Sequence, residues 1–364
     1  MKLEKNKFLM TSSLKDKIIT CAIVVIFFAI AQVLVNAGMV GSLFKGLLIP
    51  MCYYIIMAVS LNLTVGVLGE LSLGHAGFVC VGAYVGGFFS LITQDTIASA
   101  AIRFPLALLV GGITAAIFGI LIGIPILRLQ GDYLAIVTLA FGEIIRKVIQ
   151  NVYIIKDING LHFGFTTPID PSTIDLATKQ DIINGPMAVG GIPKDTKLWI
   201  AVVLAVITII VIMNLVDSRS GRAIMAIRDN RIAAEATGID ISKHKLIVFT
   251  VSAFFAGIAG VLYAHFGTLT TVKFDYNMSI LILVFVVLGG IGNIRGSIIA
   301  AVLLYALPEM LRELQAYRML AYAILLIVMM ILRNNDKFNQ GYEKFVAKIR
   351  SMVKIGKKKK EEAA

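Results

Sequence analysis

Apolar residues in this chain form long blocks separated by short polar or glycine-rich segments. A helix needs about 20 residues to cross a hydrocarbon core of about 30 Å, so such blocks predict membrane-spanning helices. The ten expected segments are Ile18 to Val35, Leu43 to Val67, Leu71 to Ile92, Phe104 to Leu127, Tyr133 to Gln150, Trp199 to Val216, Leu246 to Phe266, Met278 to Ile294, Ser297 to Met310 and Ala316 to Leu332. The last three are short. We expect Met278 to Met310 to form two short spans, and a single re-entrant hairpin is the alternative.

Composition and charge support a membrane protein. Of 364 residues, 58% are hydrophobic and 15% charged, whereas a soluble domain has roughly 25% charged residues. A soluble globular domain, a disordered chain, collagen and a disulfide scaffold are therefore excluded. The net charge of +12 lies at the ends of apolar blocks and in the tail, which argues against a nucleic-acid groove. Cys21, Cys52 and Cys80 lie inside apolar blocks without metal-ligand spacing, so we expect buried small side chains.

The Lys and Arg residues predict the orientation, because cytoplasmic loops retain positive charge. They gather in residues 1–17, 217–245 and 333–364. We therefore predict an all-α polytopic membrane protein of about ten (8–10) helices with both termini in the cytoplasm, a membrane domain at 18–332, and a basic tail near anionic headgroups. Ala29-Ile30-Ala31 resembles a signal-peptide cleavage site, but the length of the first block favours an uncleaved anchor.

Two polar stretches are longer than simple turns. The external stretch, 155–198, is rich in Gly and Pro, so we expect irregular structure that serves as a docking surface or as a solvated connector. The cytoplasmic stretch, 217–245, contains RSGRAIMAIRDNRIAAEAT from Arg219 to Thr237, which predicts one amphipathic helix stopped by Gly238. Such a helix lies on lipid headgroups or inserts into a partner's groove, and its mixed charge favours the partner.

Ionisable residues inside spans are costly and are therefore candidates for function. Glu143, Arg146 and Lys147 have the spacing at which Glu143 reaches either base on one helix face. Helix assembly, gating, substrate contact and interfacial snorkelling all remain open for this cluster.

A second set, Glu70, Ser72, Gly74 and His75, begins the third block among many glycines. A broken helix that lines the translocation path and close helix packing through Gly82 and Gly86 are equally supported. A lone histidine such as His75 is more often a structural residue than a proton relay. The sequence indicates no functional role for His162 or His265.

Two nucleotide-binding motifs do not apply. The sequence contains no GxxxxGK[ST] phosphate loop, so any ATPase is a separate polypeptide. The run GGIGNIRG at 289–296 lies between apolar spans, which favours a tight cytoplasmic turn over a dinucleotide fingerprint.

Several segments in order resemble one family. They are NLTVGVLGELSLGHAGFVCVGAY at 62–84, LQGDYLAIVTLAFGEIIRKVIQN at 129–151, NGPMAVGGIP at 184–193, RSGRAIMAIRDNRIAAEATGI at 219–239 and GGIGNIRGSIIAA at 289–301. The chain resembles M-type permeases of ABC importers for branched-chain amino acids. The stretch between Asn151 and Asn184 departs from that family by being longer, which leaves the identity of the external partner open.

The resemblance implies the ABC importer permease fold in the cytoplasmic membrane of a bacterium. It implies three kinds of partner: a second homologous permease, two cytoplasmic ATPases that bind ATP-Mg, and an extracytoplasmic substrate-binding protein. The chain itself would bind no cofactor or metal. The residues implied to couple to the ATPases are Arg219, Arg222, Arg228, Asp229, Glu235, Ala236 and Gly238.

An alternative from another class is a secondary transporter or channel that works alone on an amino acid, urea or an amide. Glu143, Arg146 and His75 would then form a proton relay. Related permeases carry several small solutes, so the spans do not identify the substrate.

Overall fold

The computed structural model describes residues 14–38, 41–94, 96–97, 99–126, 129, 131–157, 160–166, 180–311, 317, 320–321, 323–324, 326–328 and 331. It divides into two compact units, Met1–Leu304 and Tyr305–Ala364. The expected basic tail and about half of the positions of the tenth segment, Ala316 to Leu332, lie outside the described residues. The description below concerns the first unit.

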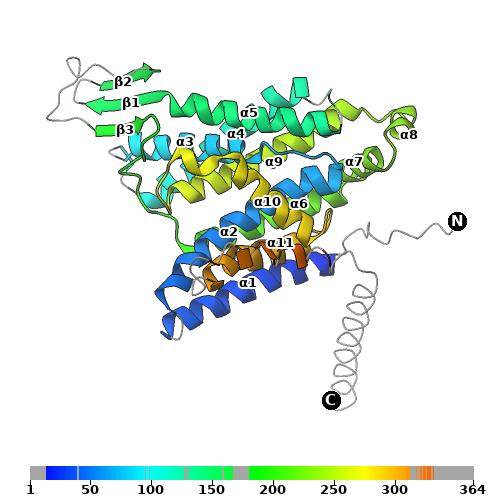
Figure 1. The fold of residues 1–364 in the computed structure, drawn as a ribbon, viewed down its shortest axis with the longest axis horizontal. Helices are drawn as coiled ribbons and strands as arrows, with labels where there is room; N and C mark the ends of the chain where they lie inside the picture. Colours follow the sequence, from blue (N-terminus) through cyan, green and yellow to red (C-terminus); the bar gives the residue numbers. More distant parts are fainter. Residues whose placement is uncertain are drawn as a thin grey trace, which may run out of the picture. The chain divides into compact units, whose positions relative to one another are not determined.

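Long helices make up most of the first unit (Figure 1). In chain order they are α1 (Leu14–Asn36), α2 (Ser42–Asn62), α3 (His75–Ile92), α4 (Ala100–Ile126), α5 (Asp132–Gln150), α6 (Leu198–Asp217), α9 (Ile241–Ala264) and α10 (Tyr276–Gly289), followed by α11 (Ile294–Met310), which begins in this unit. Each corresponds to one of the first nine predicted segments. The largest differences are of five residues: α9 begins before the expected Leu246, and α2 and α10 end before the expected Val67 and Ile294.

Six of these helices are long and apolar enough to cross a membrane: α1, α2 with its extension, α3, α4, α6 and α9. The chain is therefore a polytopic integral membrane protein. The buried share of the apolar window divides the six helices into two groups: it is 94% for α2, 78% for α3 and 72% for α9, against 44% for α4, 39% for α6 and 22% for α1. The exposed apolar faces of α1 and α6 suit contact with lipid or with another membrane subunit.

Glycines bring the inner helices close together. A Cβ atom at Gly82 of α3 would lie 2.3 Å from the carbonyl oxygen of Gly257 of α9. One at Gly257 would lie 2.7 Å from the carbonyl oxygen of Gly111 of α4. Larger side chains would push these backbones apart, because small residues let helices approach closely in a membrane. The predicted glycine packing through Gly82 is confirmed.

A small antiparallel sheet follows α5. Its strands β1 (Val152–Asp157), β2 (Gly160–Phe165) and β3 (Gln180–Asn184) are arranged in the order β2-β1-β3. The expectation of an all-α chain with an irregular external stretch is therefore wrong in this region. The β-branched and aromatic run from Val152 to Ile155 favours a strand, and much of the Gly and Pro content lies beyond β3, at 185–193.

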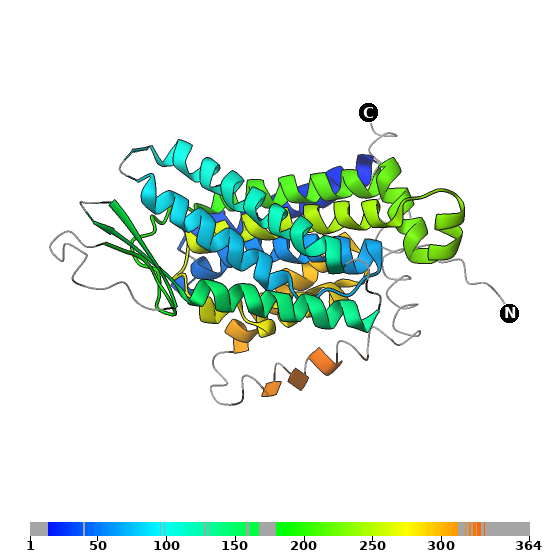
Figure 2. The ribbon, with the colours of Figure 1, turned by 90° about the horizontal axis from the view of Figure 1, so that it is seen from above.

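The sheet lies at one end of the first unit, and a pair of short helices, α7 (Arg219–Asp229) and α8 (Arg231–Ala236), lies at the other (Figures 1 and 2). We call these ends the sheet end and the α7–α8 end. The sheet follows α5 and the helix pair follows α6, so opposite ends are what the predicted order of crossings requires.

The glycine-rich run at 289–296 forms the expected turn. It joins α10 to α11, and Gly290 and Gly292 have positive φ angles of 110° and 80°, which residues with a Cβ rarely adopt. Residues 276–310 therefore form two short helices rather than one long helix, as both two short spans and a re-entrant hairpin would require. Cys52 and Cys80 are fully buried, as expected, whereas Cys21 is only half buried.

Candidate functional site

The polar residues predicted in the third block lie at a break between α2 and α3. The hydrogen bonding of α2 widens into a π-helix, η1 (Leu63–Leu68), which ends at Gly69 with a φ of 81°. Residues 69–74 are not helical, and α3 begins only at His75. The predicted segment Leu71 to Ile92 is therefore helical only from His75, and non-helical backbone at 69–74 joins the two helices.

Buried polar contacts hold this break in place. Glu70 forms an ion pair with Lys245 of α9, and the side chains are 16% and 4% exposed. Oε2 of Glu70 is buried without a hydrogen-bond partner among the described residues. The backbone N–H of Leu73 donates to Oγ1 of Thr138 on α5, at 3.0 Å. The break is thus tied to two other helices, and Glu70 retains an acceptor atom.

His75 belongs to a separate chain of buried hydroxyl groups. Its Nε2 lies 2.9 Å from Oγ of Ser60, whose carbonyl oxygen accepts a hydrogen bond from Ser252 Oγ at 2.7 Å. Thr64 of the π-helix donates to the same Ser252 oxygen at 3.1 Å. His75 is 1% exposed. These contacts fit the structural reading of His75, because buried polar groups are normally satisfied in this way.

Ser72 and Gly74 complete the predicted set. Ser72 is 2% exposed. A Cβ atom at Gly74 would lie 2.2 Å from the carbonyl oxygen of Thr138, so α5 passes directly over the end of the break. Gly74 thus allows α5 to pack closely against the non-helical segment. Non-helical backbone and close helix packing are therefore compatible here.

The stretch at 217–245, predicted to be cytoplasmic, contains two helices rather than the single helix that we predicted. Asn230 separates α7 from α8 with extended dihedral angles, and its Oδ1 accepts the N–H of Ala233 at 3.0 Å. An Asn in this position caps the second helix at the cost of interrupting the first. Gly238 stops α8 as predicted, with a φ of 82° and a hydrogen bond from its N–H to the carbonyl of Glu235.

The helix pair has a packed face and an exposed face. Ile227, Ala234 and Ile241 form a small apolar cluster beneath the pair. Ile232 is 80% exposed on the outside. The exposed predicted coupling residues are Arg219, Arg222, Asp229, Glu235, Ala236 and Gly238. Arg228 instead turns inward, and its Nη1 donates to the carbonyl of Gly66 at 2.9 Å.

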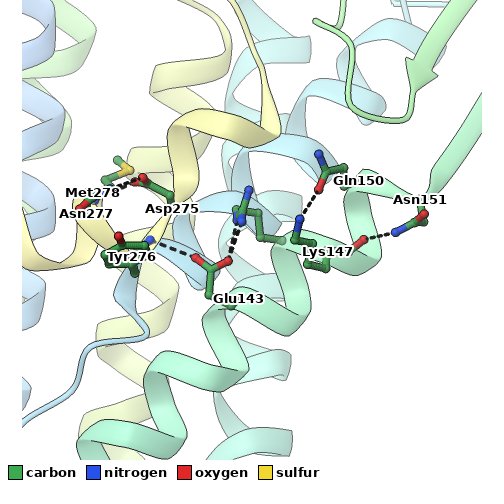
Figure 3. A network of polar contacts seen from close by, with 9 residues as sticks. Glu143, Lys147, Gln150, Asn151, Asp275, Tyr276, Asn277 and Met278 are labelled. Carbon is green, nitrogen blue, oxygen red and sulfur yellow. Dashed lines mark hydrogen bonds and ion pairs between the residues drawn. The ribbon is translucent and has the colours of Figure 1, made fainter.

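Glu143 joins α5 to the start of α10 (Figure 3). Its Oε2 accepts hydrogen bonds from Arg146 at 2.7 and 2.9 Å, which confirms the predicted pair. Its Oε1 accepts the backbone N–H of Tyr276 at 3.0 Å. Lys147 turns to Gln150 instead, at 3.2 Å. The geometry fits helix assembly, because a carboxylate at a helix N-terminus is stabilising.

Several residues that form buried polar contacts were not predicted from the sequence. Lys245 was assigned to the loop but lies in α9. Arg103 of α4 forms a buried ion pair with Asp195, at 2.9 Å, and His265 is buried beside Ser90, at 2.7 Å. Their partners lie 92 to 175 residues away, so no local pattern could have indicated them. Among the described residues, no group of three His, Cys, Asp or Glu side chains could hold a metal ion.

A bundle of apolar helices with a buried polar segment between α2 and α3 and an amphipathic helix pair at one end defines a polytopic membrane protein. The family model for the branched-chain amino acid transport system / permease component matches residues 43–332. The chain therefore belongs to this family, which makes it a transport subunit rather than an enzyme.

Individual relatives agree with the family match. The chain is 37% identical to the high-affinity branched-chain amino acid transport system permease protein LivM of Salmonella typhimurium, over 77% of the chain and 66% of that relative. It is 28% identical to a probable LivM of Methanocaldococcus jannaschii, over 74% and 81%. It is 26% identical to LivH of Salmonella typhimurium, over 37% and 44%. The match thus spans slightly less than two thirds of the first relative. No solved structure matches the chain.

Proposed function

We propose that this chain is the permease subunit of an ATP-driven importer that moves branched-chain, hydrophobic amino acids into a bacterial cell. It resides in the cytoplasmic membrane with about ten crossings and both termini inside. It works with a second homologous permease, two cytoplasmic ATPases that bind ATP-Mg, and an extracytoplasmic substrate-binding protein. The similarity to both LivM and LivH supports a pair of related permeases.

The observation that carries the proposal is the helix pair at the α7–α8 end. A loop that only linked two spans would not need two capped helices over an apolar cluster. Ile232 is 80% exposed and stands beside charged residues of both signs. A protruding apolar side chain within a polar surface suits insertion into a groove on a protein partner. We assign that groove to the ATPase.

The break at 69–74 is the proposed element of the translocation path. Irregular backbone at membrane depth is tolerated where it is buried in protein or lines a cavity. The break offers a carboxylate, Glu70, with one acceptor oxygen unused by the described residues. That oxygen suits the ammonium group of an amino acid as it leaves the path. Ser72, Gly74 and His75 shape the segment that carries Glu70, and Glu143 with Arg146 fixes the neighbouring α5 to α10.

The test is reconstitution of the chain with its partner subunits in liposomes. We expect leucine, isoleucine or valine uptake that requires ATP and the binding protein and that persists when the proton gradient is collapsed. Uptake by this chain alone, or uptake that follows the proton gradient, would establish the stand-alone transporter instead.

One substitution tests the ATPase interface directly. Ile232→Glu places a charge in the proposed groove, so we expect the ATPases to be lost from the purified complex. Met187→Glu is the matched control, because Met187 is 64% exposed beyond β3. Equal retention of the ATPases by both variants would refute the assignment of Ile232.

A further inference from the structure

Arg228 differs from the two other arginines of α7. Arg219 and Arg222 are exposed, and Arg222 bonds to the nearby carbonyl of Asp217. The Arg228 side chain is only 27% exposed, and its Nη1 donates to the carbonyl oxygen of Gly66 at 2.9 Å. Gly66 lies in the π-helix, 162 residues earlier in the chain. Arg228 therefore connects the helix pair to the end of α2.

Further contacts along the Arg228 side chain hold it in this position. Nε and Nη2 donate to Oδ1 of Asp229, at 3.3 and 3.1 Å, which orients the guanidinium. The aliphatic stem passes over Gly69, where an added Cβ atom would lie 2.5 Å from Cγ of Arg228. Gly69 thus serves two needs at once, its positive φ and the space for this stem.

Gly66 is itself locked into the surrounding structure. An added Cβ atom there would lie 2.3 Å from the backbone nitrogen of Gly292, in the turn between α10 and α11. Oδ1 of Asn62 accepts the N–H of Gly292 at 2.9 Å, and its Nδ2 donates to Ser297 at 3.0 Å. Arg228 thus touches the point where α2, its π-helix and this turn meet.

The chemistry of the contact suits a movable link. The last carbonyl groups of a helix have no partner within it and attract cations. Arg228 supplies that cation from a different element. A π-helix is rare, occurs mostly as a single turn, and is frequent at functional sites. A small displacement of a π-helix changes which of its carbonyl groups accept hydrogen bonds. Glu70 lies two residues after this π-helix ends at Leu68.

We propose that Arg228 is the positioning residue that transmits movement of α7 to the break at 69–74. This inference rests on the proposed function, in which the ATPases move the helix pair. When α7 shifts, Arg228 carries the Gly66 carbonyl with it, and the turns of the π-helix rearrange. The break then moves Glu70 and Ser72 relative to α5 and α9. The exposed residues of the helix pair bind the ATPase, whereas Arg228 contacts the π-helix that precedes the break at 69–74.

The first test uses Arg228→Ala, Arg228→Lys and the control Lys243→Ala, which removes an exposed lysine of α9 outside the helix pair, in the reconstituted complex. We expect Arg228→Ala to assemble and to retain basal ATPase activity, while substrate uptake falls about tenfold, a typical size for coupling between sites. Arg228→Lys restores part of the uptake because it still donates to the Gly66 carbonyl. Lys243→Ala behaves as the wild type. Normal uptake by Arg228→Ala in an assembled complex would overturn the proposal.

A second measurement separates transmission from a merely structural contact. Amide hydrogen exchange is followed at 69–76 and at 219–236, with and without an ATP analogue. In the wild-type complex both segments should respond to nucleotide. In Arg228→Ala only 219–236 should respond.

The wild-type complex is decisive by itself if the variant does not assemble, because a response confined to 219–236 would overturn the proposal. Failure of the proposed function looks different: the wild-type complex would then show no ATP-dependent uptake at all.

Discussion

Glu70 and Glu143 are both paired carboxylates, but Glu70 lies in the non-helical segment before α3, whereas Glu143 lies within α5. Glu143 pairs with Arg146 on its own helix, and its second oxygen accepts the N–H of Tyr276. Glu70 pairs with Lys245, 175 residues away, and Oε2 has no hydrogen-bond partner among the described residues. A carboxylate with both oxygens used holds two elements together. One with a free oxygen at a break in a helix can bind something further.

The largest effect is expected at the Glu70 pair. Lys245→Met leaves the Glu70 carboxylate buried without its cation, and breaking a buried ion pair on one side costs about 3–5 kcal/mol. We expect a large fall in the thermal unfolding midpoint of the purified complex, and loss of uptake. The double variant Glu70→Gln with Lys245→Met should recover most of the thermal stability, because it leaves no unpaired charge.

The double variant also separates two roles of Glu70. If Glu70 only stabilises the break, uptake should return together with stability. If its free oxygen contacts the substrate, stability returns and uptake does not, which is the result that we expect. An equally low midpoint for the single and the double variant would show that the ion pair is not what stabilises this region.

At Glu143 we expect a smaller effect that is confined to stability. Glu143→Ala removes the acceptor for both Arg146 and the N–H of Tyr276, and a hydrogen bond to a charged group contributes about 1.5–3 kcal/mol. Glu143→Gln retains an oxygen for Tyr276 and should lose less. Thermal unfolding measures both variants. ATP-dependent uptake per folded complex should remain, and its loss would make Glu143 a path residue like Glu70.

The two carboxylates also show which kinds of contact can be predicted from the sequence. The pair of Glu143 with Arg146 followed from helical periodicity, because residues three apart lie on one face. The helices themselves followed from apolar block length, and the stop at Gly238 from the conformational freedom of glycine. Each of these inferences needs only local information.

Contacts that depend on distant parts of the chain could not be predicted. The partners of Glu70 and Arg228 are set by how the helices pack, and Lys245 appeared to belong to a loop. The sheet was missed for a similar reason, since the pairing of β1 with β3 joins segments separated by more than 20 residues. The helix boundary at Asn230 could have been anticipated, because Asn is a preferred cap.

The smallest effect is expected at Lys147, which the sequence grouped with Glu143 and Arg146. Its side chain is on an exposed part of α5 and bonds to Gln150 rather than to Glu143. Exposed substitutions away from special contacts usually change stability by less than about 0.5 kcal/mol. Lys147→Ala should therefore leave the unfolding midpoint and uptake unchanged, whereas Arg146→Ala should lower the midpoint as its partner's variant does. Equal losses from both variants would mean that Glu143 is held by the charge of the whole helix face and not by one bonded arginine.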